Sequence, residues 1–311
     1  MTLPSRVTIT EVGPRDGFQA EKEFIPTESK IDILNQMMDA GVPRIEYSSF
    51  VSPRAVPQLA DTVEVLQGVD RGRATLVALI ANAKGAERAA QAKCDELVVV
   101  LSASESHNKK NVNRSVDESL AGMEDIMRLA SSAGIPVHGA IATAFGCPFE
   151  GDVPTEQIVR IAKHLKSVGF SGVGLGDTTG MATPPLVHQT CAALHDEVPG
   201  LPVSLHFHNT RGIGLCNVMA GLEEGVTEYE SSIGGLGGCP FAPGATGNIC
   251  TEDLVYLLHE MGIETGIDLD ALCEVAHSVE SAVRHGLPGQ VMKAGHRLNL
   301  HDIEAVSTAK G

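Results

Sequence analysis

The clearest indication of the fold is a pair of apolar runs, ELVVVL at Glu96–Leu101 and VHGAIA at Val137–Ala142. A segment with helical periodicity, Asp117–Ala133, lies between them. The two flanking runs are short, apolar and rich in β-branched residues, which is typical of buried parallel strands. Between them, apolar residues recur at helical spacing, so an amphipathic helix is expected there. The stretch therefore predicts a β-α-β unit.

The same alternation extends along the chain in both directions. Strands are predicted at Val7–Glu11, Arg44–Tyr47, Thr75–Leu79, Glu96–Leu101, Val137–Ala142, Gly172–Leu175, Val203–Phe207 and Glu228–Ser231. Helical periodicity marks Lys30–Ala40, Asp117–Ala133, Gln157–Val168, Pro185–Leu194, Gly212–Glu224 and Glu252–Met261. Eight strands joined by helical crossovers predict a (β/α)8 TIM barrel. A doubly wound open sheet is the alternative, but the turn at Gly13–Gly17 does not have the G-x-G-x-x-G pattern of that fold.

The length of 311 residues suits either two domains or one large barrel. Because the barrel pattern runs through most of the chain, we predict one catalytic domain over residues 1–311. The barrel should cover about residues 5–265. A helical extension should follow at about residues 266–311, with a helix at Leu269–Arg284.

The composition excludes several classes of partner. The chain has 23 Lys and Arg against 39 Asp and Glu, a net charge of −16, and its longest basic cluster is Lys109-Lys110. A general nucleic-acid surface or anionic-membrane surface is therefore not expected. The seven cysteines form no C-x-x-C pair, and the N-terminus has no signal-peptide pattern. These features favour a cytoplasmic protein with reduced thiols.

In a TIM barrel, functional residues lie where the strands end and the following loops begin. Arg15 and Asp16 follow the first predicted strand, Glu46 lies in the second, and Asp177 follows the sixth. A turn with a local ion pair would also explain Arg15 and Asp16. The strand ends nevertheless collect charged groups at the catalytic face of the predicted barrel.

The seventh strand ends in the sequence His206-Phe207-His208. Residues two apart on a strand point to the same side, so both imidazoles should face one way and Phe207 the other. Asp16 lies close by in a closed barrel and can add a carboxylate. Two imidazoles and a carboxylate suit a catalytic Mg²⁺, Mn²⁺ or Zn²⁺ ion. Two ordinary core or surface histidines are the alternative.

Two loops add further candidates. The eighth strand runs into a glycine-rich segment from Gly234 to Asn248, which predicts a lid or an anion-binding loop, and Cys239 within it is either an acid–base thiol or an incidental one. After the fourth strand, Lys109 and Lys110 either meet a phosphate or carboxylate of the substrate or belong to a solvated loop.

Taken together, these windows resemble the hydroxymethylglutaryl-CoA (HMG-CoA) lyase family, from about Val7 to Ile263. The matching motifs are EVGPRDG (11–17), SFVSP (49–53), KKN (109–111), GCP (146–148), LGDT (175–178), the His-x-His pair, GLGGCP (235–240), GN (247–248) and TEDL (251–254). Their order and spacing make the resemblance specific.

The resemblance implies a site and a reaction. The metal ligands would be Asp16, His206, His208 and Asn248. The catalytic groups would be Arg15 and Cys239, with Glu46 and Asp177 as supporting acids and Asp16 or His206 as the base. With Mg²⁺ or Mn²⁺ bound, the implied reaction is the retro-Claisen cleavage of HMG-CoA to acetyl-CoA and acetoacetate, a step of leucine degradation. The acyl-CoA would be held by local cations, with Lys109 and Lys110 as candidates, and a homodimer is implied by analogy.

One window departs from the lyase pattern. Asn209-Thr210-Arg211 stands where the family usually has Asp-Thr followed by an aromatic residue, so a lyase for another 3-hydroxy-3-substituted acyl-CoA is an alternative. A Claisen-condensing synthase is a second, although such chains usually continue into a lid and a regulatory domain. A pyruvate-dependent metal aldolase and a barrel that only binds CoA or metal are less favoured.

Overall fold

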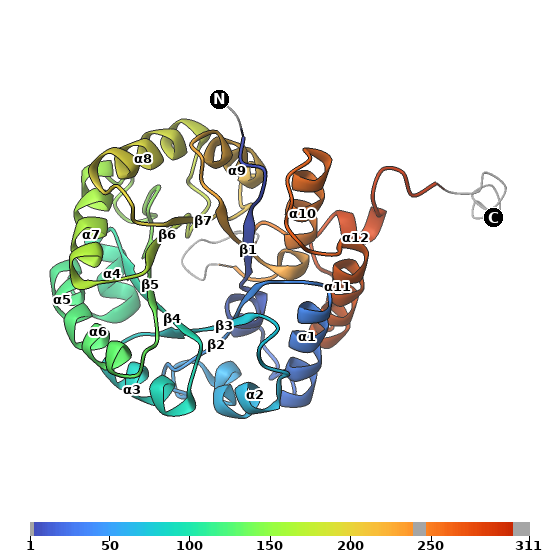
Figure 1. Ribbon diagram of the computed structural model, residues 1–311, viewed down its shortest axis with the longest axis horizontal. Coiled ribbons are helices and arrows are strands. Elements are labelled where there is room, and N and C mark those ends of the chain that lie inside the picture. Colours follow the sequence, from blue (N-terminus) through green and yellow to red (C-terminus); the bar gives the residue numbers. More distant parts are fainter. Residues whose placement is uncertain (1–2, 239–246, 301–311) are drawn as a thin grey trace.

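The computed structural model describes residues 3–238 and 247–300. The strands are β1 (Thr8–Glu11), β2 (Arg44–Ser49), β3 (Thr75–Ile80), β4 (Glu96–Ser102), β5 (Val137–Ala142), β6 (Gly172–Gly176), β7 (Val203–His206) and β8 (Glu228–Ser231). They pair in parallel in chain order, and β8 pairs back with β1 to close the barrel (Figure 1). The predicted TIM barrel is confirmed.

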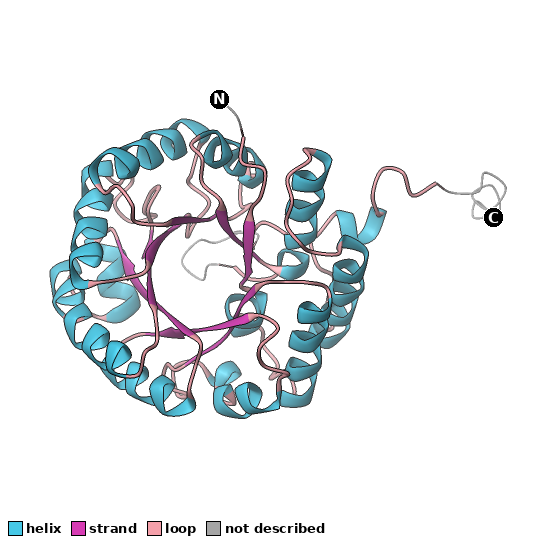
Figure 2. Ribbon diagram, viewed as in Figure 1, coloured by secondary structure: helices cyan, strands magenta, loops and turns pink. Residues whose placement is uncertain are grey.

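A ring of helices surrounds the strands (Figure 2). The helices are α1 (Thr27–Asp39), α2 (Thr62–Gly68), α3 (Ala83–Ala92), α4 (Glu105–Val112), α5 (Val116–Ala121), α6 (Met123–Ser132), α7 (Thr155–Val168), α8 (Pro184–Glu197), α9 (Gly214–Glu223), α10 (Thr251–Glu260), α11 (Leu269–Val283) and α12 (Val291–Ala294). The single helix predicted at Asp117–Ala133 is wrong. It is two helices, α5 and α6, which meet at Gly122. A capping box of Ser115 and Glu118 opens α5.

The two faces of the barrel wall bury different residues. Outward-facing side chains such as Ile45, Leu97 and Leu205 are fully buried against the helices and form the main hydrophobic core. The inward-facing residues of β3 and β4 form a separate, smaller apolar cluster, which includes Val77 and Val98. The remaining inward-facing residues are largely polar, so they can supply catalytic or ligand-binding groups inside the barrel.

The C-terminal extension lies against the barrel. Helix α11 packs on α1 and α10, and Ser278 Oγ donates a hydrogen bond of 3.0 Å to Gln36 Oε1. Within residues 3–238 and 247–300, no helix has the length and apolar character needed to cross a membrane.

Candidate active site

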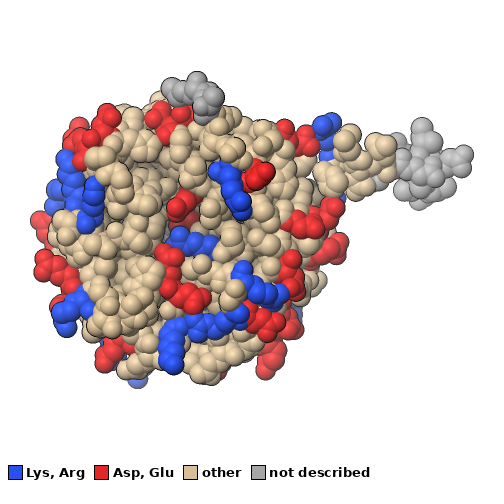
Figure 3. Space-filling model, in the orientation of Figure 1, with Lys and Arg blue, Asp and Glu red and all other residues tan. Residues whose placement is uncertain are grey.

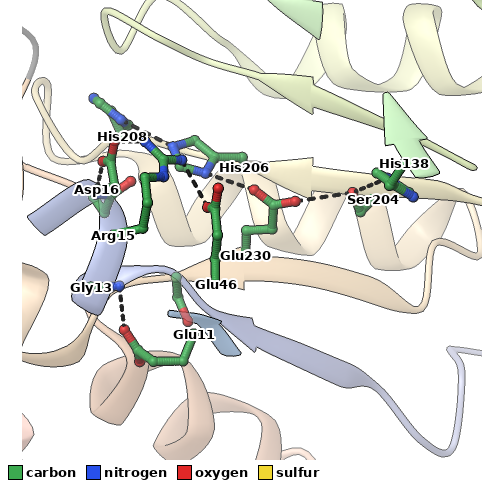
Figure 4. Close-up of polar contacts among 12 residues, drawn as sticks. Glu11, Gly13, Arg15, Asp16, Glu46, His138, Ser204, His206, His208 and Glu230 are labelled. Atoms are coloured by element: carbon green, nitrogen blue, oxygen red, sulfur yellow. Dashed lines mark hydrogen bonds and ion pairs between the residues drawn. The ribbon is translucent and has the colours of Figure 1, made fainter. Parts of the chain in front are cut away.

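The first part of the site is a π-helical turn at Gly13–Gly17, directly after β1. The guanidinium of Arg15 donates to Asp16 Oδ1 at 2.6 Å and to Glu46 Oε2 at 2.8 Å. Arg15 therefore joins the end of β1 to β2. Burial raises the pKa of Glu46, and the charge of Arg15 opposes that shift. The turn thus presents a partly buried guanidinium between two carboxyl groups (Figure 4).

The second part is the pair of histidines after β7. His206 and His208 lie on the same side of the strand, with their Nε2 atoms 3.1 Å apart, while Phe207 is buried on the opposite side against Phe145. This arrangement follows from strand alternation, as expected. His206 Nδ1 lies 3.0 Å from Glu230 Oε2, so a carboxylate holds the far side of the ring.

Asn248 reaches the site because residues 247–250 run beside the end of β7. Ile249 N donates to Phe207 O at 3.0 Å, and Asn248 Nδ2 donates to Asp16 Oδ2 at 2.8 Å. A Cβ on Gly237, whose φ is +105°, would lie 2.7 Å from Asn248 Nδ2, so this close approach requires glycine. The structure thus brings all four predicted metal ligands together.

These residues fit a divalent metal ion. The ligand atoms of Asp16, His206 and His208 all lie within 4.8 Å of one another. The Oδ1 atom of Asn248 is buried and accepts no hydrogen bond from the described residues. Two nitrogens bound side by side at about 2.1 Å lie about 3 Å apart, which matches the two histidines. Nitrogen and oxygen donors together suit Mg²⁺, Mn²⁺ or Zn²⁺.

The charges of the site agree with this donor set. Burial would raise the pKa of Asp16, but Arg15 and the two histidines outweigh it and lower that pKa to about 2. Burial and the neighbouring His206 lower the pKa of His208 to about 4. At neutral pH the site therefore offers an ionised carboxylate and a neutral imidazole, the forms that bind a cation.

A chain of polar groups behind His206 was missed in the sequence. Glu230 Oε1 accepts a hydrogen bond of 3.4 Å from Ser204, whose Oγ lies 3.2 Å from His138 Nε2 (Figure 4). Burial would raise the pKa of Glu230, but the hydrogen bond and charge of His206 lower it to about 2. A carboxylate behind a ligand histidine fixes the orientation of the ring. The only sequence signal was a charged residue facing into the barrel.

Two further buried carboxyl groups lie on the outer side of the barrel wall. Glu11 accepts hydrogen bonds from Gly13 N at 2.7 Å, Ile233 N at 2.8 Å and Thr251 Oγ1 at 2.6 Å. Glu252 accepts from Gly234 N and from Cys250 Sγ. Neither Glu11 nor Glu252 was predicted as a site residue from the sequence. They tie the turn of Arg15 and Asp16 to the segment that leads to Asn248.

Three other predicted site residues fall within the described part of the chain, and of these Asp177 is joined to the histidine segment, since its N donates to His206 O at 2.8 Å. Asp177 Oδ1 accepts hydrogen bonds from Met181 N and Ala182 N, and burial raises the Asp177 pKa to about 6. Asp177 does not line the cavity described below, so it shapes the loop after β6. Lys109 and Lys110 are exposed on α4 and are also absent from the cavity wall. Cys239 lies outside the described residues.

The site opens into a cavity of about 1100 Å³. Its wall includes the metal-site residues Asp16, His206 and His208, and also Gly238, the residue before Cys239. Further along, the wall carries the basic residues Lys84, Arg88 and Arg114, which the sequence analysis did not select. On the face in Figure 3, basic and acidic side chains are interspersed, which agrees with the absence of a long basic cluster in the sequence.

The departing window Asn209-Thr210-Arg211 has a structural role. Asn209 Oδ1 accepts a hydrogen bond from Gly214 N at 3.2 Å, at the start of α9. Arg211 Nη1 donates to Thr179 O at 3.1 Å and to Gly180 O at 2.5 Å. Asn209 therefore fixes the start of α9, whereas Arg211 joins the loop after β7 to the loop after β6, and neither residue lines the cavity.

The closed barrel and this donor set define a class, a (β/α)8 enzyme with a candidate divalent-metal site at the C-terminal ends of its strands. Within that class, the chain belongs to the HMGL-like family, whose model matches residues 6–279. Members of this family include carbon–carbon lyases, and the chain is one of them.

Its relatives are similar over nearly their whole length. The hydroxymethylglutaryl-CoA lyase YngG of Bacillus subtilis is 43% identical over 93% of this chain and 97% of that protein. The mitochondrial hydroxymethylglutaryl-CoA lyase of Homo sapiens is 41% identical over 96% and 92%, respectively. A solved HMG-CoA lyase from Acinetobacter baumannii, in complex with coenzyme A and 3-methylmalate, is 44% identical and has a TM-score of 0.92, with 97% and 100% covered.

Proposed function

We propose that this protein cleaves HMG-CoA to acetyl-CoA and acetoacetate, with Mg²⁺ or Mn²⁺ held by Asp16, His206, His208 and Asn248. The observation that carries the proposal is the convergence of three ligand groups within 4.8 Å beside a partly buried Arg15, in a chain whose relatives are HMG-CoA lyases. A bound divalent ion would supply Lewis acidity to the substrate hydroxyl and so lower its pKa.

The reaction needs two proton transfers, one from the C3 hydroxyl of the substrate and one to C2. A base takes the proton of the C3 hydroxyl, and Asp16 and His206 are the candidates because both line the cavity. The C2–C3 bond then breaks, and C3 becomes the ketone carbon of acetoacetate. The electron pair of the broken bond passes to C2, which becomes part of a thioester enolate. Protonation of C2 completes acetyl-CoA, and Cys239 is the proposed acid.

Arg15 is the group proposed to stabilise the enolate. Its guanidinium is fixed by Asp16 and Glu46, and its Nε atom is buried and has no partner among the described residues. A fixed positive group of this kind stabilises developing negative charge without reorganisation. Glu46 and Asp16 hold this group at the edge of the cavity.

The rest of the proposal concerns the CoA moiety and the assembly. CoA phosphates approach a protein with a net charge of −16, so local cations must attract them. Lys109 and Lys110 are the groups proposed from the sequence, and Lys84, Arg88 and Arg114 are cations in the cavity wall. A homodimeric assembly and a cytoplasmic location complete the proposal.

The direct test is incubation of the purified protein with HMG-CoA and either Mg²⁺ or Mn²⁺. We expect equal amounts of acetoacetate and acetyl-CoA, loss of both with EDTA, and recovery when the metal is restored. Turnover that is unaffected by EDTA would contradict the metal site. No turnover with either metal would contradict the proposed substrate.

A further inference from the structure

The cavity continues below the level of the candidate metal site. In the pairing of β6 with β7, Gly176 lies opposite His206 and Gly174 lies opposite Ser204. Gly174 is therefore one inward-facing position closer to the N-terminal end of the barrel than His206, and it also lines the cavity. Two residues of a strand span about 6.6 Å, so the cavity extends about that far beneath His206.

One side of this lower space is hydrocarbon. We call it the aliphatic wall, and it consists of Val51, Leu79, Val98, Val100 and Ala140. The interior of a TIM barrel is usually filled by layers of bulky side chains. Here β5 and β6 contribute Ala140 and Gly174 instead, and both line the cavity. The small side chain of Ala140 leaves space on this side, whereas a Cβ on Gly174 would lie only 2.9 Å from Ser204 Oγ, so the polar groups close the space at β6.

The part of the cavity wall formed by β2, β7 and β8 is polar. Glu46, His206 and Glu230 line the same cavity, and the Oε1 atom of Glu46 is buried with no hydrogen-bond partner among the described residues. Figure 4 shows these side chains gathered at the histidine side. A substrate that places a C3 hydroxyl and a carboxylate on this polar side turns its remaining C3 substituent away from it.

Resting on the proposed function, we propose that the aliphatic wall binds the C3 substituent of the substrate and that this substituent can be longer than methyl. The substrate class is then 3-hydroxy-3-alkylglutaryl thioesters of CoA with linear alkyl groups. An extended chain advances about 1.3 Å per carbon, so a depth of about 6.6 Å accommodates about five carbons. The alkyl chain lies against Val98, Val100 and Ala140.

The first experiment compares a series of such thioesters whose C3 group is methyl, ethyl, propyl or butyl. Release of acetyl-CoA gives kcat/KM for each, and we expect the butyl compound to stay within tenfold of the methyl compound. Calorimetry with the free 3-alkyl-3-hydroxyglutarates gives a second readout. Each added methylene should tighten binding about fourfold, because it leaves water for the aliphatic wall.

Variants locate the effect. Ala140→Phe fills the lower space and should reduce the butyl-to-methyl ratio of kcat/KM at least tenfold. Val98→Thr keeps the volume, so it should fold, and it should weaken the gain in affinity per methylene because it adds a hydroxyl to the wall. Ala192→Phe, at an exposed position of α8, is the matched control and should leave the ratio unchanged.

The outcomes separate the two proposals. Turnover of the methyl compound with a more than hundredfold loss for propyl would overturn the aliphatic-wall proposal and leave the proposed function intact. An unchanged butyl-to-methyl ratio in both Ala140→Phe and Val98→Thr would also overturn it. Failure to turn over any member of the series would reject the proposed function, and the inference with it.

Discussion

Carboxyl groups lie on both the inner and the outer face of the barrel wall near β8 and β1, but their pKa values are shifted in opposite directions. On the inner face, Glu230 meets His206, and its pKa falls to about 2. On the outer face, Glu11 accepts hydrogen bonds from two backbone N–H groups and a hydroxyl, and burial raises its pKa to about 8. Burial likewise raises the pKa of Glu252 to about 7.

The difference distinguishes two roles of these carboxyl groups: Glu230 orients a residue of the candidate site, whereas Glu11 stabilises the fold. A carboxylate beside a cationic or metal-binding partner stays ionised and orients that partner. A carboxyl surrounded by neutral donors gains protons on folding and links segments far apart in sequence. Glu11 joins the first strand end to residues near Ile233 and Thr251, more than 200 positions later.

The largest effect should come from the inner face. His206→Ala removes a proposed metal ligand and the partner of Glu230, so kcat should fall about a thousandfold or more. The bound metal, measured by atomic emission after dialysis, should fall in parallel. His195→Ala, at an exposed position of α8, is the control and should keep both activity and metal. Full metal content in His206→Ala would contradict the site.

The next effect tests the outer face. Glu11→Leu leaves the N–H groups of Gly13 and Ile233 without their acceptor, so the free energy of unfolding should fall by about 3 kcal/mol or more. Urea unfolding measures the change. Glu11→Gln keeps one acceptor oxygen and should lose less than half as much. Equal losses in the two variants would show that the acceptor atom does not matter.

A third variant separates the inner face from the ordinary polar interior. Glu230→Gln should weaken metal binding about 10- to 100-fold, because the amide orients His206 less firmly. Calorimetric titration of the metal-free protein gives the dissociation constant. Glu228→Gln is the matched control, since Glu228 lies on the same strand and face but pairs with Arg44 rather than His206. Equal changes in both variants would argue against an orienting role for Glu230.

The sequence predicted the barrel because strand and helix periodicities alternate along the chain, and these depend only on near neighbours. It missed the break at Gly122, where the apolar periodicity runs on although the helix ends. It also missed Glu230 as a site residue. Alternation places Glu228 and Glu230 alike, and only the register of β7 against β8, which pairs His206 with Glu230, distinguishes them.

The site shows the same limit. Asp16, His206 and His208 were predicted from the residues because each lies at the end of a strand or within a few residues after it, so the fold alone brings them near one another. Asn248 lies 40 residues beyond His208 and reaches the site only because residues 247–250 pair beside β7. That pairing has no local signal, and only the family resemblance indicated the residue.

A smaller effect should appear in the pH dependence of stability. Because the folded-state pKa of Glu11 is raised to about 8 from an ordinary value of 4.5, folding takes up a proton between these values. Its contribution is complete below pH 4.5 and is lost as the pH rises toward 8, at about 1 kcal/mol per pH unit. Glu252 and Asp177 keep their raised pKa values in Glu11→Gln, so between pH 6 and 8 the free energy of unfolding should fall more steeply in wild type than in the variant, by about 1 kcal/mol per pH unit. Parallel slopes would contradict the raised pKa.

The smallest effect concerns two lysines that lie outside the barrel wall, on helix α4. Lys109 and Lys110 are exposed on α4, where salt screens their attraction for CoA phosphates. Their double replacement by Ala should raise KM for the CoA thioester about threefold at low salt and leave kcat unchanged, whereas Arg114→Ala, in the cavity wall, should raise KM more and keep its effect at high salt. Steady-state kinetics at two ionic strengths decide this. A larger effect from the lysine pair would place the phosphates over α4, because an exposed charge far from the ligand cannot exceed one in the wall.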